Sequence, residues 1–412
     1  MRLAVYLDYV CRRDAGGYYA PRAFALFVAA LRREFEGLVV AVRVAPEPGR
    51  SHYAIPSDIQ VVEMPHYASA ADGVGVVRSL RPALRRWDAV LRGVDVAWVL
   101  GPQGLALPLV LLALARGKRV VLGVRQDLPA YARARHPRRR VVHAAADVLD
   151  DAFRALARFV PAVVVGPALA ARYGAGASVL PLTVSLVSDR EVDGPTPRRR
   201  WDGELTMLSV GRLDEEKNPL LLADVLARVR AADPRWRLVV CGEGPLAGAL
   251  SERLAELGVD DAAQLCGYLP LDGGLRDAYR TANVFLHVSR TEGLPQVLFE
   301  SFAARLPVVA TAVGGVPEAA GDAVLLVPPD DSEAAAASVR RLAADEGLRD
   351  RLTAAGVARV RRHTMEAELK RTAAFLKHGQ RQDGAPDALR RRGHANLATR
   401  MATRTSERET LT

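Results

Sequence analysis

The sequence predicts an α/β protein made of two Rossmann-like, doubly wound domains that face a central cleft. Apolar runs of strand length alternate with helix-length segments along almost the whole chain, which is typical of parallel sheets covered by helices on both faces. The chain has 412 residues, which is too long for one ordinary hydrophobic core, and its hydrophobic fraction of 50% is enough to fill two. In such folds ligands bind at the carboxyl ends of the strands. We therefore expect the chemistry on loops that follow strands.

The alternation of strands and helices also predicts the domain boundaries. Residues 1–8 form an apolar run that predicts a buried first strand and is too short for a signal peptide. Residues 188–203 lack periodic apolar positions and predict a linker. Strands are expected at 96–100, 119–123, 162–165, 205–210, 237–241, 284–288, 308–311 and 323–327. We expect an N-terminal domain at 1–187, a C-terminal domain at 204–364, a helix at 365–378 that can pack back on the N-terminal domain, and a disordered basic tail at 379–412.

The net charge of +10 is concentrated in arginine-rich clusters. They lie at 133–140, 198–200 and 390–392. We interpret them as solvated surface and linker charge, with peripheral contact to an anionic membrane as the alternative. Aromatic residues make up only 6% of the chain and do not interleave with these clusters, which argues against stacking on single strands. We expect no nucleic-acid partner.

The cysteines and the apolar stretches bear on location. The three cysteines are Cys11, Cys241 and Cys266, an odd number without paired spacing, which indicates neither a disulfide framework nor a zinc site. The longest apolar stretch, 105–115, is far shorter than the roughly 20 residues of a membrane-spanning helix. These features favour a reducing cytoplasm, including a peripheral place at the inner face of the membrane.

The strongest functional pattern is a pair of glutamates in the segment 289–300. Glu292 is expected on the loop after a strand, and Glu300 in the following helix, whose first turn suits Pro295. Two carboxylates so placed can accept hydrogen bonds from hydroxyls on two parts of one ligand. Gly293 lets a ligand come close to the backbone, where free helix amides favour an anion. The alternative is two ordinary glutamates near a helix terminus.

A second loop, 210–219, follows the first strand of the C-terminal domain. Arg212 can fork onto two oxygens and Lys217 supplies a compact charge, so the loop can hold a diphosphate. The alternative is a solvent loop with salt-bridged acids.

Two further loops are rich in glycine. Residues 242–247 match a dinucleotide-binding pattern superficially, but they do not follow the first strand of a domain, and a lone match is weak evidence for a nicotinamide or flavin site. The glycine pair at 16–17 follows the first strand of the chain and allows a close approach to a ligand. An ordinary tight turn is the alternative for that pair.

Taken together, these loops resemble the GT-B glycosyltransferases of the large retaining group often called family 4. The resemblance is specific over 205–330, looser over 1–190, and does not include the tail. It is carried by Gly211-Arg212-Leu213 with Lys217, by Gly242-Glu243-Gly244-Pro245, by Glu292-Gly293-Leu294-Pro295 through Glu300, and by Val313-Gly314-Gly315-Val316-Pro317-Glu318.

The resemblance implies a retaining, metal-independent hexosyltransferase of polysaccharide or glycoconjugate biosynthesis that needs no cofactor. It would move a sugar from a UDP or GDP sugar to a hydroxyl of a glycan, lipid-linked or small-molecule acceptor. The acceptor would attack the face from which the diphosphate leaves, and a donor phosphate oxygen could take its proton. Positioning and electrostatic stabilisation of the leaving group would then supply most of the rate.

The resemblance also implies roles for individual residues. The catalytic residues would be Glu292, which holds the sugar hydroxyls, and Arg212 and Lys217, which hold the diphosphate. Glu300 would hold the ribose, Gly17 would close over the diphosphate, and the backbone at 266–269 would meet the base. The full set of implied donor-binding residues is Gly17, Gly244, Gly267, Tyr268, Gly293, Leu294 and Glu300.

The chain departs from this family at one position. Many members carry a histidine near the end of a strand in the N-terminal domain, whereas the stretch 124–128 has none. We expect Gln126 or Asp127 to substitute at the acceptor or sugar edge through hydrogen bonding, or the acceptor site to be built differently. His287 lies on a predicted core strand and is interpreted as a hydrogen-bonded core residue.

Two other functions stay open at this point. One is a catalytically degenerate transferase-like subunit that binds a partner enzyme, although the cations and glutamates of the pattern are retained. The other is a different enzyme of the same fold, such as a nucleotide-sugar epimerase or a phosphorylase, although no motif for a pyridoxal lysine is found.

Overall fold

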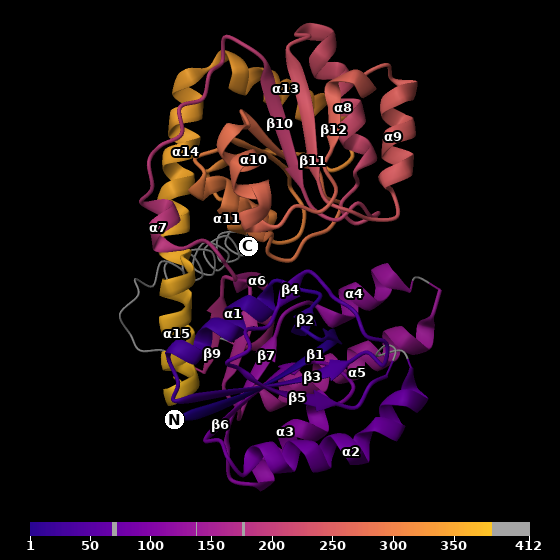
Figure 1. Cartoon of the computed structure of the whole chain (residues 1–412), viewed down its shortest axis with the longest axis vertical. Coiled ribbons are helices and arrows are strands. Elements are labelled where there is room, and N and C mark those ends of the chain that lie inside the picture. The colour runs from indigo at the N-terminus through magenta and orange to yellow at the C-terminus, as the bar shows by residue number, and fades with distance from the viewer. Residues whose placement is uncertain (68–71, 137, 175–177, 381–412) are drawn as a thin grey trace, which may run out of the picture. The chain divides into compact units, whose positions relative to one another are not determined.

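The computed structural model describes residues 1–67, 72–136, 138–174 and 178–380, and within them the chain forms two sheets (Figure 1). The predicted tail therefore lies outside the described residues from 381 onward. The strands are β1 Arg2–Asp14, β2 Gly17–Ala20, β3 Gly37–Val44, β4 Tyr53–Ala54, β5 Gln60–Met64, β6 Val96–Gly101, β7 Arg119–Val124, β8 Ala162–Val165, β9 Val179–Leu182, β10 Leu205–Val210, β11 Trp236–Cys241, β12 Ala263–Leu265, β13 Val284–His287, β14 Val308–Thr311 and β15 Val324–Val327.

Helices precede or follow most of these strands. They are α1 Phe24–Ala30, α2 Gly73–Leu91, α3 Ala106–Ala115, α4 Leu128–Arg135, α5 Arg140–Leu156, α6 Pro167–Tyr173, α7 Asp189–Val192, α8 Leu220–Ala232, α9 Ala247–Glu256, α10 Arg276–Thr281, α11 Gln296–Ala303, α12 Val316–Ala320, α13 Ser332–Ala344, α14 Glu346–Val360 and α15 Met365–His378.

Both sheets are doubly wound, as predicted. The first has the order β5-β3-β1-β6-β7-β8-β9 with parallel neighbours throughout, and β2 and β4 extend the end of β1 by antiparallel pairing. The second has the order β12-β11-β10-β13-β14-β15 and is entirely parallel. In each sheet the chain starts in the middle, winds to one edge and returns to fill the other. The order therefore reverses between β1 and β6 and between β10 and β13.

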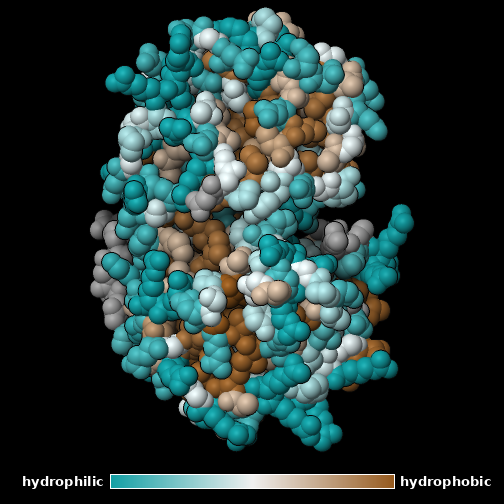
Figure 2. All heavy atoms as spheres, in the orientation of Figure 1, coloured by the Kyte–Doolittle hydropathy of each residue, from teal (hydrophilic) through white to brown (hydrophobic). Residues whose placement is uncertain are grey.

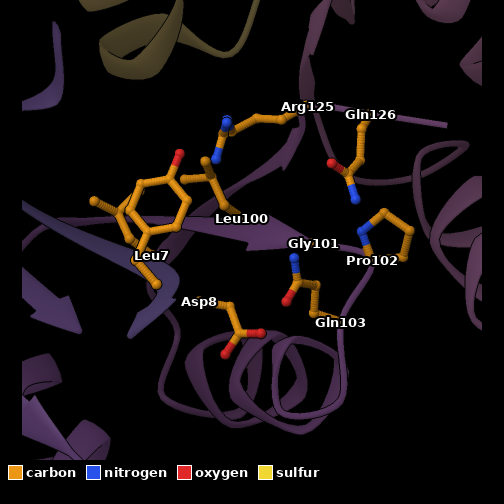
Figure 3. Close-up of a pocket in the computed structure, with 9 residues that line it drawn as sticks. Leu7, Asp8, Leu100, Gly101, Pro102, Gln103, Arg125 and Gln126 are labelled. Atoms are coloured by element: carbon orange, nitrogen blue, oxygen red, sulfur yellow. The ribbon is translucent and has the colours of Figure 1, made fainter. Parts of the chain in front are cut away.

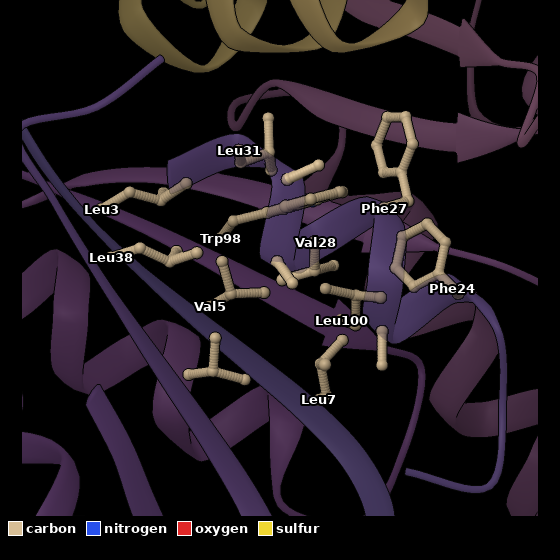
Figure 4. Close-up of a cluster of buried hydrophobic side chains, with 14 of the residues drawn as sticks. Leu3, Val5, Leu7, Phe24, Phe27, Val28, Leu31, Leu38, Trp98 and Leu100 are labelled. Atoms are coloured by element: carbon tan, nitrogen blue, oxygen red, sulfur yellow. The ribbon is translucent and has the colours of Figure 1, made fainter. Parts of the chain in front are cut away.

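Alternate residues of a strand explain why both faces of each sheet are covered. Leu3, Val5 and Leu7 of β1 belong to one buried cluster, whereas Ala4 and Tyr6 belong to another on the opposite face. The first cluster packs against α1, as Figure 4 shows, and the second against α2 and α3. The strands of the second sheet divide in the same way between two further clusters. Near-continuous apolar runs are what a sheet buried on both faces requires.

The last helix, α15, adds to the core of the first sheet although it follows the C-terminal domain in sequence. Leu369, Ala373, Phe375 and Leu376 are buried in the same cluster as β1. Thr364 caps the start of the helix, where its hydroxyl accepts a hydrogen bond from the amide of Ala367 at 3.3 Å, and Gly379 caps its end in the left-handed conformation.

Two local features differ from the sequence expectations. β1 does not end near residue 8: its pairing with β3 shifts between Leu7 and Val10, and the strand continues to Asp14. Gly17 then pairs with Asp14 in an antiparallel hairpin, so it lies at a hairpin tip rather than in a loop directly after a short strand. Apolar periodicity alone does not reveal such a continuation, because the residues beyond Val10 are mostly polar.

The linker 188–203 is more ordered than its composition indicates, because it holds the one-turn helix α7 and the buried Val192. The prediction that the arginines at 198–200 are solvated is wrong for Arg199, whose side chain is hydrogen-bonded to the protein. Its guanidinium donates to four backbone carbonyls where α10 and α11 end, those of Tyr279, Ala282, Ala304 and Arg305. Burial lowers the pKa of Arg199 to about 10. Arg199 therefore caps two helix C-termini, where a cation is favoured.

The core contribution of α15 leads to a stability prediction. We expect Phe375→Ala to lower the free energy of unfolding by roughly 3–5 kcal/mol, because the ring is 1% exposed and its removal leaves a cavity beside the first sheet. The exposed His378 on the same helix provides a control, and His378→Ala should change stability by less than about 0.5 kcal/mol. Urea titration of both variants checks this; equal stabilities would mean that α15 adds nothing to that core.

Candidate functional site

Two small pockets lie where the strand order of each sheet reverses. The N-terminal pocket is lined by Leu7, Asp8, Tyr9, Leu100, Gly101, Pro102, Gln103, Arg125 and Gln126. The C-terminal pocket is lined by Ser209, Val210, Gly211, Arg212, Leu213, Lys217, Pro219, Leu222, Val240, His287, Val288 and Ser289. Ligands of open α/β sheets bind at such reversals, outside the carboxyl ends of the strands.

Backbone-to-backbone packing holds the loops of the C-terminal pocket together. The amide of Gly211 donates to the carbonyl of Cys241 at 3.0 Å, and the amide of Gly242 donates to the carbonyl of Gly267 at 2.7 Å. A Cβ atom on Gly242 would lie 1.8 Å from the carbonyl oxygen of Gly211, so no side chain fits there. The glycines at these strand ends therefore let three loops stack without intervening side chains.

The loop that carries Glu292 is positioned in the same way by the glycine pair that precedes α12. A Cβ atom on Gly314, whose φ is +50°, would lie 1.9 Å from the carbonyl oxygen of Glu292. The amide of Gly315 donates to that same oxygen at 3.3 Å. The two loops pack directly against each other, and this packing fixes the height of Glu292 above the sheet.

The carboxylate of Glu292 is largely enclosed. Its side chain is 8% exposed, and Oε1 accepts hydrogen bonds from Ser289 Oγ at 2.8 Å and from Lys217 Nζ. His287 Nε2 lies 3.0 Å from the same oxygen. Burial alone would raise the pKa of Glu292, but the contacts with His287 and Lys217 outweigh it and lower the pKa to about 2. Glu292 is therefore ionised at neutral pH.

Glu300 lies in α11 and is held from α10. Its Oε2 accepts a hydrogen bond from the hydroxyl of Tyr279 at 2.7 Å. Burial raises the pKa of Glu300, although the Tyr279 hydrogen bond opposes that change. The pKa values of the two glutamates of the predicted pair thus shift in opposite directions: Lys217 and His287 lower that of Glu292, whereas burial raises that of Glu300.

The two predicted cations of the loop after β10 both line the C-terminal pocket, and each is paired with acids. Arg212 is 48% exposed; its Nη1 lies 2.5 Å from Asp214 Oδ2 and its Nη2 donates to Glu216 Oε2 at 2.9 Å. Lys217 is paired with Glu292. An anionic ligand at Arg212 would replace its contacts with Asp214 and Glu216.

The other predicted donor residues of the C-terminal domain lie on the same set of loops. Gly244 packs against the backbone of Leu213, where a Cβ atom would be 2.3 Å from the carbonyl oxygen. Gly267 has a φ of +66°, and the amide of Tyr268 donates to Glu243 Oε1 at 3.3 Å. The segment 293–294 lies between Glu292 and α11, which begins at Gln296, so that Pro295 is the N-cap rather than part of the first turn.

The predicted residues of the N-terminal domain occupy different settings. Gln126 follows β7 and lines the N-terminal pocket. Asp127 caps α4 by accepting from the amide of Ala130 at 3.1 Å, and its other oxygen pairs with Arg172. The carboxylate of Asp127 is therefore occupied by contacts within its own domain.

Sequence reasoning missed several residues that shape these pockets. His287 is buried on β13, as expected of a core histidine, but its neighbour there is the carboxylate of Glu292. Ser289 and Tyr279 give no sequence signal beyond their position near a strand end or in a helix. Arg125 also went unnoticed, although it stands beside Gln126 at the end of β7.

Two general properties complete the description. Over the residues that the structure describes, no group of three or more His, Cys, Asp or Glu side chains could hold a metal ion. Nor does that part of the chain contain a helix long and apolar enough to cross a membrane.

Known proteins match the C-terminal domain in sequence. Residues 197–359 match the family described as "Glycosyl transferases group 1". A D-inositol 3-phosphate glycosyltransferase of Saccharomonospora viridis is 37% identical over 175 residues, 38% of this chain and 39% of that protein. The gpi3 subunit of a phosphatidylinositol N-acetylglucosaminyltransferase from Schizosaccharomyces pombe is 33% identical over 124 residues, 30% of this chain and 27% of that protein. The matches thus span about a quarter to two fifths of these relatives.

Solved structures match almost the whole chain in fold. WaaG, a glycosyltransferase involved in lipopolysaccharide biosynthesis, superimposes with a TM-score of 0.66 over 91% of this chain and 100% of its own, at 14% identity. Anabaena HepE in complex with UDP and glucose does so with a TM-score of 0.63 over 92% and 100%, at 16% identity. These likenesses establish the two-domain GT-B architecture. Residues 197–359 thus belong to the glycosyl transferases group 1 family, and the chain as a whole has the GT-B fold.

Proposed function

We propose that this chain is a retaining glycosyltransferase that moves a sugar from a UDP or GDP sugar to a hydroxyl of a glycan, lipid-linked or small-molecule acceptor. The observation that carries the proposal is that Arg212 and Lys217 line the C-terminal pocket and that Lys217 pairs with an ionised Glu292 beside it. Two cations and one carboxylate match a ligand that is anionic at one end and rich in hydroxyls at the other. A nucleotide-diphosphate sugar has this chemistry.

The diphosphate is assigned to Arg212 and Lys217. Arg212 is half exposed, and ion pairs of that kind are worth little in water, so a ligand with two phosphates can replace Asp214 and Glu216 at small cost. The guanidinium can bind two phosphate oxygens at once, and Lys217 adds a point charge. Charge that develops on the departing diphosphate is then stabilised by groups already in place.

The hydroxyls of the donor are assigned to the two glutamates. The contacts of Glu292 with Ser289, Lys217 and His287 all fall on Oε1, which leaves Oε2 for a sugar hydroxyl. The backbone amides of 293–294 can add donors beside it. Glu300 would exchange or share its bond to Tyr279 with the ribose. Glu292, with a pKa of about 2, is a weak base, so in this scheme the acceptor's proton passes to a donor phosphate oxygen.

Relatives support both the donor and the range of acceptors. HepE has been solved with UDP and with UDP and glucose, which makes UDP the first nucleotide to test. The curated relatives are named for transfer to inositol 3-phosphate and to phosphatidylinositol, so acceptors of very different size occur among proteins with a similar C-terminal domain. One of these names specifies N-acetylglucosamine as the transferred sugar, and the other specifies no sugar.

The donor site predicts a selective nucleotide shift. Of UDP, GDP, ADP and dTDP, one should raise the melting temperature, because a ligand at about 100 times its Kd stabilises the folded state by roughly 2.7 kcal/mol. Arg212→Ala and Glu300→Ala should each abolish the shift. Arg228→Ala is the matched control, since Arg228 is 49% exposed and pairs with Glu333 on the same domain. A chain that responds to no nucleotide would contradict the transferase proposal and favour the degenerate subunit.

Glu292 predicts a pH-dependent loss of stability. Because its pKa in the folded state, about 2, is below the ordinary value of 4.5, its ionised form stabilises the fold above pH 4.5, and this contribution is lost as the pH falls towards 2. We expect Glu292→Gln to be less stable than the wild type by roughly 3 kcal/mol at pH 7 and nearly equal to it near pH 2. Denaturant titrations at pH 7, 4 and 3 measure the difference; a pH-independent difference would show that Glu292 is not held ionised.

We also propose that α5 and the residues before it contact an anionic membrane surface. Val141 and Val148 are 83% and 68% exposed and lie two turns apart on one side of α5. The segment 138–140 adds three exposed arginines at the start of that helix. Figure 2 shows hydrophobic residues at the surface in several places. Exposed apolar side chains alone therefore do not single out α5, and the three arginines are the feature that favours it. Arginine near an anionic surface adds about 1 kcal/mol per side chain.

The membrane proposal predicts salt-sensitive vesicle binding. The full chain should sediment with phosphatidylserine-containing vesicles at low salt and be released at high salt. The triple variant Arg138→Glu, Arg139→Glu, Arg140→Glu should bind at least about tenfold more weakly. A charge-matched triple variant of the exposed arginines at 228, 235 and 237 should bind like the wild type. Absence of any binding at low salt would rule out this surface.

A further inference from the structure

The N-terminal pocket carries a positive charge that nothing in its own domain neutralises. Arg125 follows β7 and lines the pocket together with Gln126, while Gln103 and Asp8 lie on the other side of the same space (Figure 3). Throughout the described chain, no carboxylate forms an ion pair or hydrogen bond with the Arg125 guanidinium. Asp127, two residues away, is taken up by Arg172 and by the cap of α4.

Two aromatic rings hold Arg125 instead of an acid. Its guanidinium carbon lies 4.8 Å from the ring centroid of Tyr9 and 4.7 Å from that of Phe24. Ring faces attract a cation, but each such contact contributes only about 1–2 kcal/mol and accepts no hydrogen bonds. The five guanidinium N–H groups still need acceptors. Burial lowers the pKa of Arg125 to about 10, so the group is charged at neutral pH.

Asp8, the acid of the pocket, does not serve as the counter-ion of Arg125. Arg43 Nε lies 2.7 Å from Asp8 Oδ1, and that oxygen also accepts from Tyr6 at 2.8 Å and from Tyr67 at 2.5 Å. The Asp8–Arg43 pair is therefore neutral as a unit, and Arg125 remains the uncompensated charge. Asp8 Oδ2 is buried and has no hydrogen-bond partner among the described residues, so it can accept a hydroxyl of a ligand.

The amides beside Arg125 widen what the pocket can recognise. Gln103 and Gln126 come from the loops after two neighbouring strands, β6 and β7, and each offers both a donor and an acceptor. A cation, two carboxamides and a free carboxylate oxygen within one small pocket suit a ligand with one anionic group next to several hydroxyls. The guanidinium can bind both oxygens of a phosphate or a carboxylate.

We propose that the N-terminal pocket binds an anionic group of the acceptor, a phosphate or a carboxylate, on the guanidinium of Arg125. Neighbouring hydroxyls of the same molecule then bind Gln103, Gln126 and Asp8 Oδ2. This assignment rests on the proposed transferase function and narrows its acceptor to a sugar or polyol that carries a negative charge. It also means that the stretch without the expected histidine provides a cation instead.

The test compares charged and neutral probes on the full chain saturated with the nucleotide that it binds. Glucose 6-phosphate, glucuronate and glucose are titrated by calorimetry at constant ionic strength. At least one of the two anionic probes should bind about tenfold or more tightly than glucose, because a charge-assisted pair of hydrogen bonds is lost with the neutral sugar. The anionic probe that binds more tightly identifies the preferred group, a phosphate for glucose 6-phosphate or a carboxylate for glucuronate.

Variants separate recognition from packing. Arg125→Met keeps an aliphatic stem between the rings of Tyr9 and Phe24, and it should remove the preference for the anion while leaving the nucleotide shift unchanged. Arg116→Met, at an exposed arginine of the same domain paired with Asp88, is the control and should keep the preference. Equal affinity of the wild type for all three probes, with normal nucleotide binding, would overturn the anion pocket alone. If the wild type bound no nucleotide, the proposed function itself would be overturned.

Discussion

The reversal of strand order in each parallel sheet is the constraint on which the functional geometry depends. Where the chain turns from winding one way to winding the other, the loops after β10 and β13 leave in opposite directions and keep a space open between them. Arg212, Lys217 and Glu292 stand on loops at that edge, and Glu300 stands on α11. The N-terminal sheet repeats the arrangement at β1 and β6, and its own pocket lies there.

Close backbone packing fixes the positions of the loops at the carboxyl edge of the second sheet. Gly242 against Gly211, and Gly314 against Glu292, remove side chains from the places where loops touch. The reacting groups are thus held by backbone contacts that cannot relax without moving a whole loop. Preorganisation of this kind matters for a reaction in which positioning and charge stabilisation supply most of the rate.

The electrostatics of the two pockets are opposite in kind. In the C-terminal pocket each cation has a carboxylate partner, so the pocket has little uncompensated charge before a ligand arrives and the diphosphate must compete with Asp214 and Glu216. In the N-terminal pocket Arg125 faces only aromatic rings. An anion that binds Arg125 displaces no acid from it, because Asp8 is paired with Arg43, so even a singly charged group would contribute usefully to binding.

Much of the architecture was predictable because its signals are local. Strands such as 162–165, 205–210 and 308–311 have the predicted bounds, since a short apolar run between turn residues has few other ways to be buried in a parallel sheet. The extension of β1 into a hairpin and the capping role of Arg199 were not predictable. Both depend on backbone groups that are distant in sequence, namely those of β2 and of the ends of α10 and α11.

By itself the sequence determined the fold class, the alternation that builds it, the loops that carry Arg212, Lys217 and Glu292, and the helix that carries Glu300. Periodicity and turn residues are properties of neighbouring positions, so one chain is enough to read them. Only the tertiary structure decided which charges are matched: that Glu292 is ionised between Lys217 and His287, that Asp127 is occupied by Arg172, and that Arg125 has no acid. Electrostatic state depends on distance and burial, and these follow from packing between segments far apart in the chain.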